Sequence, residues 1–487
     1  MQGRLAICEC PPGYAGPQCQ ITERTFGGHG WAWFPPLEQC ENSHLSLEFM
    51  TESAGGIIFY NGPVDAPEMG VSIYQDFISL ELSNGRPRLL VDFGSGTSEV
   101  VVNTVKELND GEWHHVDIFW TREDIRMTID YCNDAKFDED TERPSMNRST
   151  CEHRAMIKPY NEFLNVNSPL QIGGVFHRDV NKYFQWRHQH TREGFKGCIR
   201  NFIHNSRTYD LGSPGGSVDS VSGCSVSEEK CQANSLTNIC EHGQCLGSYK
   251  NAHCQCDPGW MGTHCDTETP VKMFQQTSFM RYALSFDPNP YITDIQMRFR
   301  TRQKNGELIR ITGRNSREYC ILEIKDRRLR FRYHLNQLHS MKEFELSLPE
   351  YVVSDGIWHT VRVIRHGSTA IIEADGGGGK KSNEITDIAD MHQLLVVSKQ
   401  GIVVGGDVNH MGPAAYYVEN GLHDSCVTDI RIDQRHLPMD NGSENAAVTE
   451  SRGIIDGCIS VNSCSKGMDT CSPPFVCTDL WNYHECT

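Results

Sequence analysis

Several features that would reveal a function on their own are absent from this sequence. It has no run of about 18 apolar residues, so we expect no transmembrane helix within it. Its first ten residues, MQGRLAICEC, contain no apolar stretch of the kind found in signal peptides. The formal net charge of −18 over 487 residues argues against nucleic acid as a partner, because nucleic-acid-binding surfaces are basic.

Catalytic motifs are missing as well. The sequence contains no HExxH zinc-protease motif, no GxSxG nucleophile elbow and no Walker loop. The glycine run at 376–379 is followed by Lys380 and Lys381, but it lacks the Ser or Thr of a phosphate-binding loop and lies between expected strands. We therefore predict that the chain is not an enzyme.

Cysteine, in contrast, is abundant. The 21 cysteines indicate an oxidising compartment, in which disulfides persist. The sequons that begin at Asn147 and Asn441 predict N-glycosylation at both asparagines and agree with export. Together these features predict an extracellular glycoprotein.

Six cysteines near the middle of the chain, from Cys231 to Cys265, are separated by 8, 4, 8, 1 and 8 residues. So small a segment cannot bury enough apolar surface to fold without cross-links. A zinc site is the alternative, but the single C-x-C and the absence of paired CxxC knuckles favour disulfides. The spacing and the ending CQCDPGWMGTHC resemble an epidermal-growth-factor-like (EGF-like) module. This resemblance implies the pairs Cys231–Cys245, Cys240–Cys254 and Cys256–Cys265.

Parts of the same cysteine pattern recur at both ends of the sequence. Residues 8–19 repeat the second half of the module, in which Cys10 and Cys19 can pair. Near the other end, four cysteines match the first half of a module and imply the pairs Cys464–Cys477 and Cys471–Cys486. We expect the sequence to be an excerpt that is cut inside a module at each end.

The two long segments between these modules are predicted to be all-β. Ile78, Leu80 and Leu82 alternate with polar residues, which predicts a strand with one apolar face inward and one polar face outward. The segments also repeat each other. DGEWHHV at 110–116 recurs as DGIWHTV at 355–361, and QIGG at 171–174 recurs as VVGG at 403–406.

These repeated strings, together with FKGCIRN at 195–201, resemble laminin G-like domains, which are jelly-roll β-sandwiches. The expected fold class is therefore mainly β: two laminin G-like jelly-roll β-sandwiches, joined and flanked by disulfide-rich EGF-like modules. The expected domains are a partial EGF-like module at 1–20, a laminin G-like domain at 26–224, a complete EGF-like module at 228–266, a second laminin G-like domain at 270–458 and a partial EGF-like module at 462–487.

Three disulfides are predicted inside the long segments. One closes each domain, and the third closes a polar loop at 132–151. Cys320 alternates with Leu322 and Ile324, so we expect a buried free thiol there. Cys8 and Cys40 are then the two cysteines left unassigned, and nothing else in the sequence favours a link between them. The three expected pairs are Cys198–Cys224, Cys426–Cys458 and Cys132–Cys151.

The laminin G resemblance implies a calcium site in the first of these domains. In that family the metal lies at a rim of the sandwich, and its ligands come from an Asp that opens a strand, a backbone carbonyl and a nearby loop. The matching positions are Asp76, the carbonyls of Phe93 and Phe163, and the side chain of Asn165, or Asn167 if the loop is shifted. So few protein ligands suit weak binding of a hard cation, with a dissociation constant of roughly 10⁻⁴–10⁻³ M. The alternative is that Asp76 caps a turn and Asn165 bonds its own loop.

The second laminin G-like domain departs from this ligand pattern. Glu318 replaces the aspartate, and Val397 stands where the polar side chain is needed. We expect no calcium there.

Two rows of arginines mark the second domain. In each row, arginines alternate with apolar residues, so three guanidinium groups share one face of a strand. Guanidinium forks match sulfate oxygens, which favours sulfated-glycan binding, and an ordinary solvated sheet face is the alternative. The rows are Arg298, Arg300 and Arg302, and Arg328, Arg330 and Arg332.

Three strings extend the resemblance over the whole chain, at 26–40, 132–151 and 464–486. They resemble the membrane-proximal ectodomain of the neural cadherins of arthropods, within the cadherin family. The resemblance implies an extracellular region of a single-pass plasma-membrane receptor for calcium-dependent cell–cell adhesion, which acts as a structural stalk and recognition unit. Its partner would be a cell-surface protein, bound homophilically only through regions outside this sequence. The alternative is a neurexin-like or matrix-type laminin G module that binds a protein or a sulfated glycan.

Overall fold

The computed structural model describes the chain except for residues 1–13, 16–18, 39–41, 65–75, 95, 122, 133–136, 139–144, 147, 158–165, 178–189, 206, 234–239, 315–317, 336–342, 378, 386–392, 409–417, 441, 461, 466–470, 473–474 and 487. The chain divides into two compact units, which are described separately. One unit holds residues 1–256 and 263–266, and the other holds residues 257–262 and 267–487.

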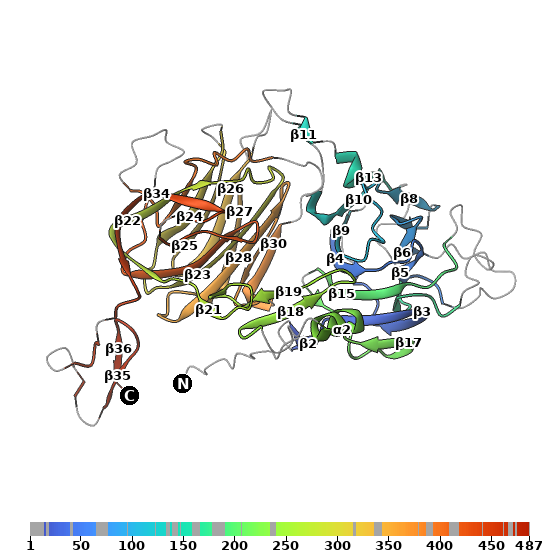
Figure 1. The fold of residues 1–487 in the computed structure, drawn as a ribbon, viewed down its shortest axis with the longest axis horizontal. Helices are drawn as coiled ribbons and strands as arrows, with labels where there is room; N and C mark the ends of the chain where they lie inside the picture. The colour runs from blue at the N-terminus through green and yellow to red at the C-terminus, as the bar shows by residue number, and fades with distance from the viewer. Residues whose placement is uncertain are drawn as a thin grey trace. The chain divides into compact units, whose positions relative to one another are not determined.

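A long strand, β3 (Glu23–Phe34), ties together the two layers of the first sandwich (Figure 1). Its first half pairs with β15 (Lys196–His204) and its second half with β14 (Leu170–Ile172), so the strand belongs to both layers. One layer continues from β15 through β4 (Ser43–Met50), β9 (Trp113–Trp120), β10 (Asp124–Ile129) and β13 (Glu152–Met156). The other continues from β14 through β5 (Gly56–Asn61), β6 (Phe77–Ser83), β7 (Arg86–Asp92) and β8 (Ser98–Val101).

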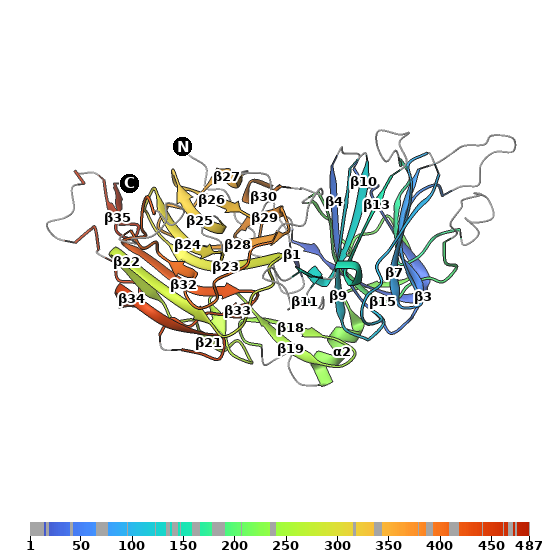
Figure 2. The same cartoon turned by 90° about the horizontal axis from the view of Figure 1, so that it is seen from above.

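The second sandwich is built in the same way around β22 (Lys272–Leu284), and Figure 2 shows it from above. The first half of β22 pairs with β32 (Ser425–Ile432) and the second half with β31 (Ile402–Val404). One layer runs from β32 through β23 (Ile292–Arg300), β28 (Trp358–His366), β29 (Thr369–Ala374) and β30 (Ser382–Ile385). The other runs from β31 through β24 (Gly306–Thr312), β25 (Tyr319–Lys325), β26 (Arg328–His334) and β27 (Phe344–Val352).

The strand pairs of these layers are antiparallel, and apolar residues of both layers meet in one core per sandwich. In the first core, the rings of Phe59 and Phe202 come from opposite layers and meet edge to face, with centroids 5.6 Å apart. Such alternating inward residues are what a two-layer sandwich needs. The predicted fold class is confirmed.

The polar faces differ from the expectation. Ser79 and Glu81 alternate with the core residues of β6, yet both are 0% exposed. The backbone N–H of Thr191 donates to Glu81 Oε2 at 2.8 Å, and Arg88 Nη1 lies 2.6 Å from Glu81 Oε1. A segment that includes Thr191 therefore covers the outer face of this layer, so the prediction of a solvated outer face was wrong here.

Disulfides close each sandwich and hold the small modules. A nine-residue helix, α2 (Ser225–Ala233), follows Cys224 directly and begins the complete module. Among the described residues no helix is long and apolar enough to cross a membrane. The bonds formed are Cys132–Cys151, Cys198–Cys224, Cys231–Cys245, Cys240–Cys254, Cys256–Cys265, Cys426–Cys458, Cys464–Cys477 and Cys471–Cys486.

Some residues with a predicted bond or modification fall in the parts of the chain that the structure does not describe. Cys19 is disulfide-bonded, but its expected partner Cys10 lies outside the described residues, as do Cys8 and Cys40. The two predicted glycosylation sites, Asn147 and Asn441, also lie outside them. These assignments stay predictions.

Cys320 gives the first testable prediction. It is a free thiol on β25 with 0% exposure, and burial raises its pKa to about 11. Because alkylation requires an exposed thiolate, we expect iodoacetamide at pH 8 to leave Cys320 unmodified in the native chain and to label it after denaturation. Peptide mapping by mass spectrometry distinguishes Cys320 from any other thiol. Labelling of Cys320 in the native chain would contradict this burial.

Candidate functional site

Each sandwich presents one short turn that carries the repeated DGxWH string. In the first, Asp110 Oδ1 accepts a hydrogen bond from the Glu112 N–H at 2.9 Å and lies 3.1 Å from Nε2 of His114. Nδ1 of His114 lies 2.7 Å from Oδ2 of Asp130, at the end of the neighbouring strand. The histidine therefore bridges two aspartates and fixes the turn. We call residues 110–114, and the equivalent residues 355–359, the docking turns.

The docking turn of the second sandwich has the same bridge. His359 is 1% exposed, with Nε2 3.1 Å from Asp355 Oδ1 and Nδ1 2.7 Å from Asp375 Oδ2. Burial by itself would lower the pKa of His359, but the hydrogen bonds and charges of the two aspartates raise it to about 9. The imidazole is therefore a cation at neutral pH, and each ring nitrogen donates to a carboxylate.

The glycine of each docking turn is required by its backbone and by its neighbours. Gly111 and Gly356 have φ of +81° and +82°, a left-handed conformation that glycine adopts without strain. A Cβ atom at Gly111 would lie 2.9 Å from Cβ of Tyr249, and one at Gly356 would lie 2.7 Å from Cζ of Arg302. A side chain thus packs directly on each turn: Tyr249 in the first unit and Arg302 in the second.

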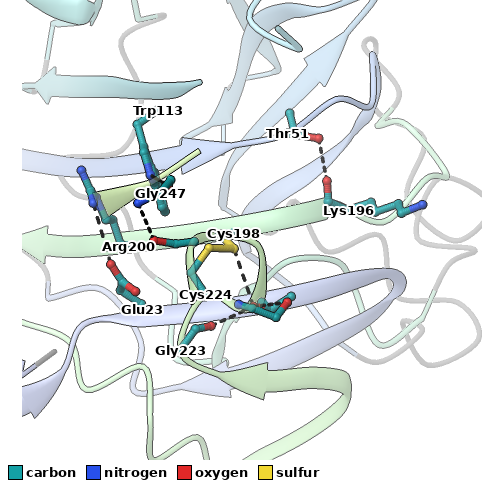
Figure 3. Close-up of a disulfide and its surroundings, with 12 residues drawn as sticks. Glu23, Thr51, Trp113, Lys196, Cys198, Arg200, Gly223, Cys224 and Gly247 are labelled. Carbon is teal, nitrogen blue, oxygen red and sulfur yellow. Dashed lines mark hydrogen bonds and ion pairs between the residues drawn. A yellow bond between two sulfur atoms is a disulfide. The ribbon is translucent and has the colours of Figure 1, made fainter. Parts of the chain in front are cut away.

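In the first unit that neighbour is the hairpin of the complete EGF-like module, β18 (Gly243–Gly247) and β19 (Ala252–Cys256). The Tyr249 N–H donates to the Gly111 carbonyl at 3.0 Å, and Trp113 Nε1–H donates to the Gly247 carbonyl at 3.0 Å. Figure 3 shows Trp113 pointing at Gly247 beside the Cys198–Cys224 disulfide. The Arg200 guanidinium lies 4.0 Å from the Trp113 ring centroid on the same side.

In the second unit that neighbour is Arg302, and Arg302 and Arg300 in turn bind the hairpin of the last module, β35 (Cys477–Asp479) and β36 (His484–Cys486). Trp481 at its tip is only 5% exposed, and the guanidinium of Arg300 lies 4.7 Å from its ring. Arg300 Nε also donates to the Gly356 carbonyl at 2.5 Å. Arg302 Nε donates to the Trp481 carbonyl at 2.7 Å, and its Nη2 donates to the Leu480 carbonyl.

The two docked hairpins share one feature that sequence reasoning missed. Tyr249 stands four residues after Cys245, and Trp481 stands four residues after Cys477, which are the third cysteines of their modules. Trp481 and Asn482 have φ of 60° and 57°, which is uncommon for a bulky side chain and is found in tight hairpin turns. An aromatic residue at this spacing is the signal that could have revealed the contact.

The predicted calcium rim is partly described. Asp76 directly precedes β6 and Phe93 directly follows β7, and the pairing of Phe77 with Asp92 brings these two positions to the same end of adjacent strands. Both residues are buried, with Asp76 6% and Phe93 3% exposed. A carboxylate next to a strand-end carbonyl fits a hard cation.

The remaining predicted calcium ligands lie on the loop before β14. Phe163 and Asn165 fall outside the described residues, and the alternative ligand Asn167 is exposed. The full ligand set therefore stays a prediction, with Asp76 and Phe93 as the part whose placement is known.

Comparison with known proteins agrees with this geometry. A model of the laminin G domain matches residues 49–207 and 299–435, which together are more than half of the chain. The chain belongs to the laminin G domain family. The two matches fall on the two sandwiches, and the predicted resemblance is confirmed.

Similar proteins are cadherins. The chain is 47% identical to neural-cadherin of Drosophila melanogaster over 99% of its own length and 16% of that protein. It is 43% identical to putative neural-cadherin 2 of the same organism, over 98% of its length and 27% of that protein. The chain thus spans about a sixth of the length of the first relative and about a quarter of the length of the second. Among solved structures, the LG1-3 region of the laminin alpha2 chain is 15% identical to this chain with a TM-score of 0.33, and the match covers 90% of this chain and 69% of that one.

The arginine rows of the second laminin G domain are engaged with other groups. Arg298 lies over the ring of Trp358 at 5.3 Å, while Arg300 and Arg302 hold the docked hairpin. On β26, Arg330 Nη2 lies 2.8 Å and Arg332 Nε 2.7 Å from Glu323 Oε1. The row also contacts Glu343, Glu345 and the Asp326 carbonyl, through Arg332, Arg330 and Arg328 respectively. The expected row of free guanidinium forks is therefore largely paired within the domain.

At the rim of the second laminin G domain, the departures from the calcium pattern are visible. Glu318 precedes β25 and is 3% exposed, and the pairing of Tyr319 with His334 places it opposite Leu335. The Val397 carbonyl accepts from the Gly401 N–H at 2.7 Å, and its side chain offers no oxygen. A carboxylate is thus present, but Val397 stands at the position where a polar side chain is predicted in the first domain.

The raised pKa of His359 predicts a loss of stability in mildly alkaline solution. Because the folded-state pKa of about 9 exceeds the ordinary value of 6.5, the bridge contributes fully below pH 6.5 and is lost as the pH rises through 9. At about 1.4 kcal/mol per pKa unit, we expect His359→Gln to remove up to about 3 kcal/mol at pH 6 and far less at pH 10. Urea unfolding at both pH values measures this.

His423→Gln is the matched control, because His423 also pairs with an aspartate, Asp424, but its side chain is 48% exposed. We expect this variant to follow the parent chain within about 0.5 kcal/mol at every pH, as surface pairs contribute little. A pH-independent loss in His359→Gln would contradict the charged bridge.

Proposed function

We propose that this chain is the extracellular, membrane-proximal stalk of a calcium-dependent cell–cell adhesion receptor of the cadherin family. The neural-cadherin relatives support the adhesion assignment. The observation that carries the stalk role is that each unit holds the tip of the EGF-like hairpin that follows the laminin G domain in sequence. The docking turn binds this tip directly in the first unit, and Arg300 and Arg302 beside the turn bind it in the second. A chain that transmits force between a cell surface and its partner needs modules that stay fixed on their neighbours.

In this role, calcium binds to the first laminin G domain only. Its ligands are Asp76 and the Phe93 carbonyl, and Phe163 and Asn165 complete the set. The ion would neutralise the carboxylate of a residue that is only 6% exposed and would join the ends of β6 and β7. In the second domain, Val397 removes a ligand, so we propose no ion there.

In this role the partner is a cell-surface protein, the chain lies on the outer side of the plasma membrane, and no catalysis is involved. His114 and His359 are each held between two aspartates in turns that serve docking. Sulfated-glycan binding by the arginine rows is a weaker alternative, because a sulfate would have to displace Glu323 or the docked hairpin.

Removal of Trp481 tests the docked stalk. Trp481→Ala deletes a ring that is 5% exposed and stacks with Arg300, a change that typically costs about 3–5 kcal/mol in a packed site. Since Cys464–Cys477 and Cys471–Cys486 keep the module closed, we expect the hairpin to leave the docking turn while the sandwich stays folded. Hydrogen exchange of amides 477–486 should accelerate at least tenfold.

Phe475→Ala is the control, because Phe475 lies in the same module and is 57% exposed. Its hairpin amides should exchange within about twofold of the parent rate, since exposed substitutions have small effects. Equal protection in Trp481→Ala and the parent would show that docking does not depend on this aromatic tip, and the stalk proposal would lose its main support.

Calcium binding is tested by thermal stability. At 100 times its dissociation constant, a ligand that binds only the folded state stabilises it by about 2.7 kcal/mol. We expect calcium to raise the melting temperature of the first laminin G domain, and Asp76→Ala to abolish that rise. Glu318→Ala, at the equivalent position of the second domain, should leave the calcium response intact. A response that survives Asp76→Ala places the ion elsewhere.

A further inference from the structure

The two laminin G domains differ in a row of side chains on the outer face of one layer. In the first domain, Gln171 on β14 pairs with Trp33 on one side and with Tyr60 on the other. In the second, Val403 on β31 occupies the same register and pairs with Arg281 and Arg310. Two aromatic side chains of the first domain are thus replaced by two arginines in an otherwise matching row.

In the first domain this face is filled by apolar side chains. Tyr60 packs with Ile57, Phe77 and Leu90 in a small outer cluster, and all four are at most 1% exposed. The Tyr60 and Phe77 rings stack with centroids 6.3 Å apart. The cluster seals the outer face of β5 and β6.

In the second domain the same positions are charged or polar. The strand bulge that follows Ile57 in β5 recurs after Glu307 in β24, so Glu307 takes the place of Ile57. The register of β25 and β26 likewise puts Tyr319 at the position of Phe77 and Arg332 at that of Leu90. Because these groups do not fill the space, a cavity of about 180 Å³ opens over β24 and β31. A second cavity of about 250 Å³ shares Glu307 and Arg310 with it.

The charged groups that line the first cavity are already matched. Arg310 forms a two-point pair with Glu307, with Nε–Oε1 at 3.0 Å and Nη2–Oε2 at 2.6 Å, and both residues are 4% exposed. Arg281 pairs with two carboxylates, because its Nη2 lies 3.1 Å from Asp407 Oδ2 and its Nη1 lies 3.0 Å from Glu450 Oε2. The two guanidinium groups and two carboxylates of the lining sum to zero charge, and Glu450 outside the lining adds one negative charge, so an anionic guest would have to break one of these pairs or remain unpaired.

The remaining lining combines apolar and uncharged polar side chains. Val397, Val403 and Val418 supply the apolar part, which we call the valine wall, and Thr312 and Gln400 add a hydroxyl and an amide. A cavity of roughly 150 Å³ holds a guest of benzene size, so about 180 Å³ suits one six-membered ring. The cavity lies over central strands that are paired on both sides, so an extended peptide cannot add to a sheet edge there.

We propose that this outer-face cavity of the second laminin G domain binds a neutral pyranose ring of an uncharged glycan. Each sugar hydroxyl can accept from a guanidinium N–H and donate to the paired carboxylate, which leaves both ion pairs in place. The apolar side of the ring lies on the valine wall. The second cavity, beyond Glu307 and Arg310, receives the next sugar of the chain. The first cavity contains no member of the arginine rows, whereas Arg332 of one row lines the second cavity. The proposal does not rest on the stalk function.

Saturation-transfer difference NMR on the full chain tests the proposal. The probes are the methyl glycosides of glucose, galactose, mannose and N-acetylglucosamine at millimolar concentration, with a sulfated heparin disaccharide as the charged comparison. We expect saturation transfer to at least one neutral glycoside. Val403→Phe, which places a ring in the cavity while keeping the strand pairing, should weaken that binding at least tenfold. Gln400→Ala, at the exposed mouth, should weaken it about threefold without any effect on folding.

Val352→Phe is the matched control, because Val352 lies on β27 of the same domain, is 39% exposed and does not line the cavity. It should bind the glycoside as the parent does. Absence of transfer to all four neutral glycosides would overturn the proposal. Equal transfer in the parent and in both cavity variants would overturn it too, as would binding of the sulfated disaccharide alone.

Discussion

The docking turns are stiff because a buried histidine bridges two aspartates, one within the turn and one at the end of the neighbouring strand. A charged hydrogen bond in a site shielded from water is both strong and directional, so the bridge sets the path of the backbone. The glycine carbonyl of the turn then faces outward as an acceptor, and the tryptophan that follows begins a core strand. The position of the EGF-like hairpin in each unit depends on this geometry.

Docking gives the EGF-like modules apolar burial that modules of this size cannot provide by themselves. Disulfides limit their unfolded states but supply little apolar burial, so an aromatic tip exposed on a free module would have nowhere to pack. Tyr249 packs on the docking turn itself, whereas Trp481 packs on Arg300, which donates to the turn. In the first unit the contact is hydrogen-bonded to the backbone of Gly111. In the second, Arg300 lies over the indole and Arg302 donates to the carbonyls of Trp481 and Leu480. The two units thus hold an aromatic residue of the following module near the docking turn through different partners.

Much of the fold could be predicted from the sequence, because strand alternation, the DGxWH repeat and cysteine spacing each depend on a few local residues. Ile78, Leu80 and Leu82 face the core as predicted. The polar residues between them were misjudged, since Glu81 is buried by Thr191, which is 110 residues away in sequence. The calcium ligands could be predicted only from the family resemblance. Asp76 and Phe93 are brought together by the register of β6 and β7, which the sequence pattern does not show. The arginine rows show the same limit. The alternating pattern predicted that the guanidinium groups share one face, but it could not show that Glu323 of the neighbouring strand pairs with Arg332 or that Trp481 of another module packs on Arg300.

The two laminin G domains share one framework, so their differences separate what the fold requires from what it tolerates. The strand order, the Gly-Gly ends of β14 and β31 and the docking turns are common to both. The outer face is not: a row of Trp33, Gln171 and Tyr60 in one domain corresponds to Arg281, Val403 and Arg310 in the other. An apolar cluster on that face stabilises a domain directly, whereas buried ion pairs around a cavity recover at best their own desolvation cost. Stability alone would therefore favour the aromatic row in both domains. The charged row is explained more simply if the second domain uses its outer face to bind, while the first uses its own to seal the sandwich.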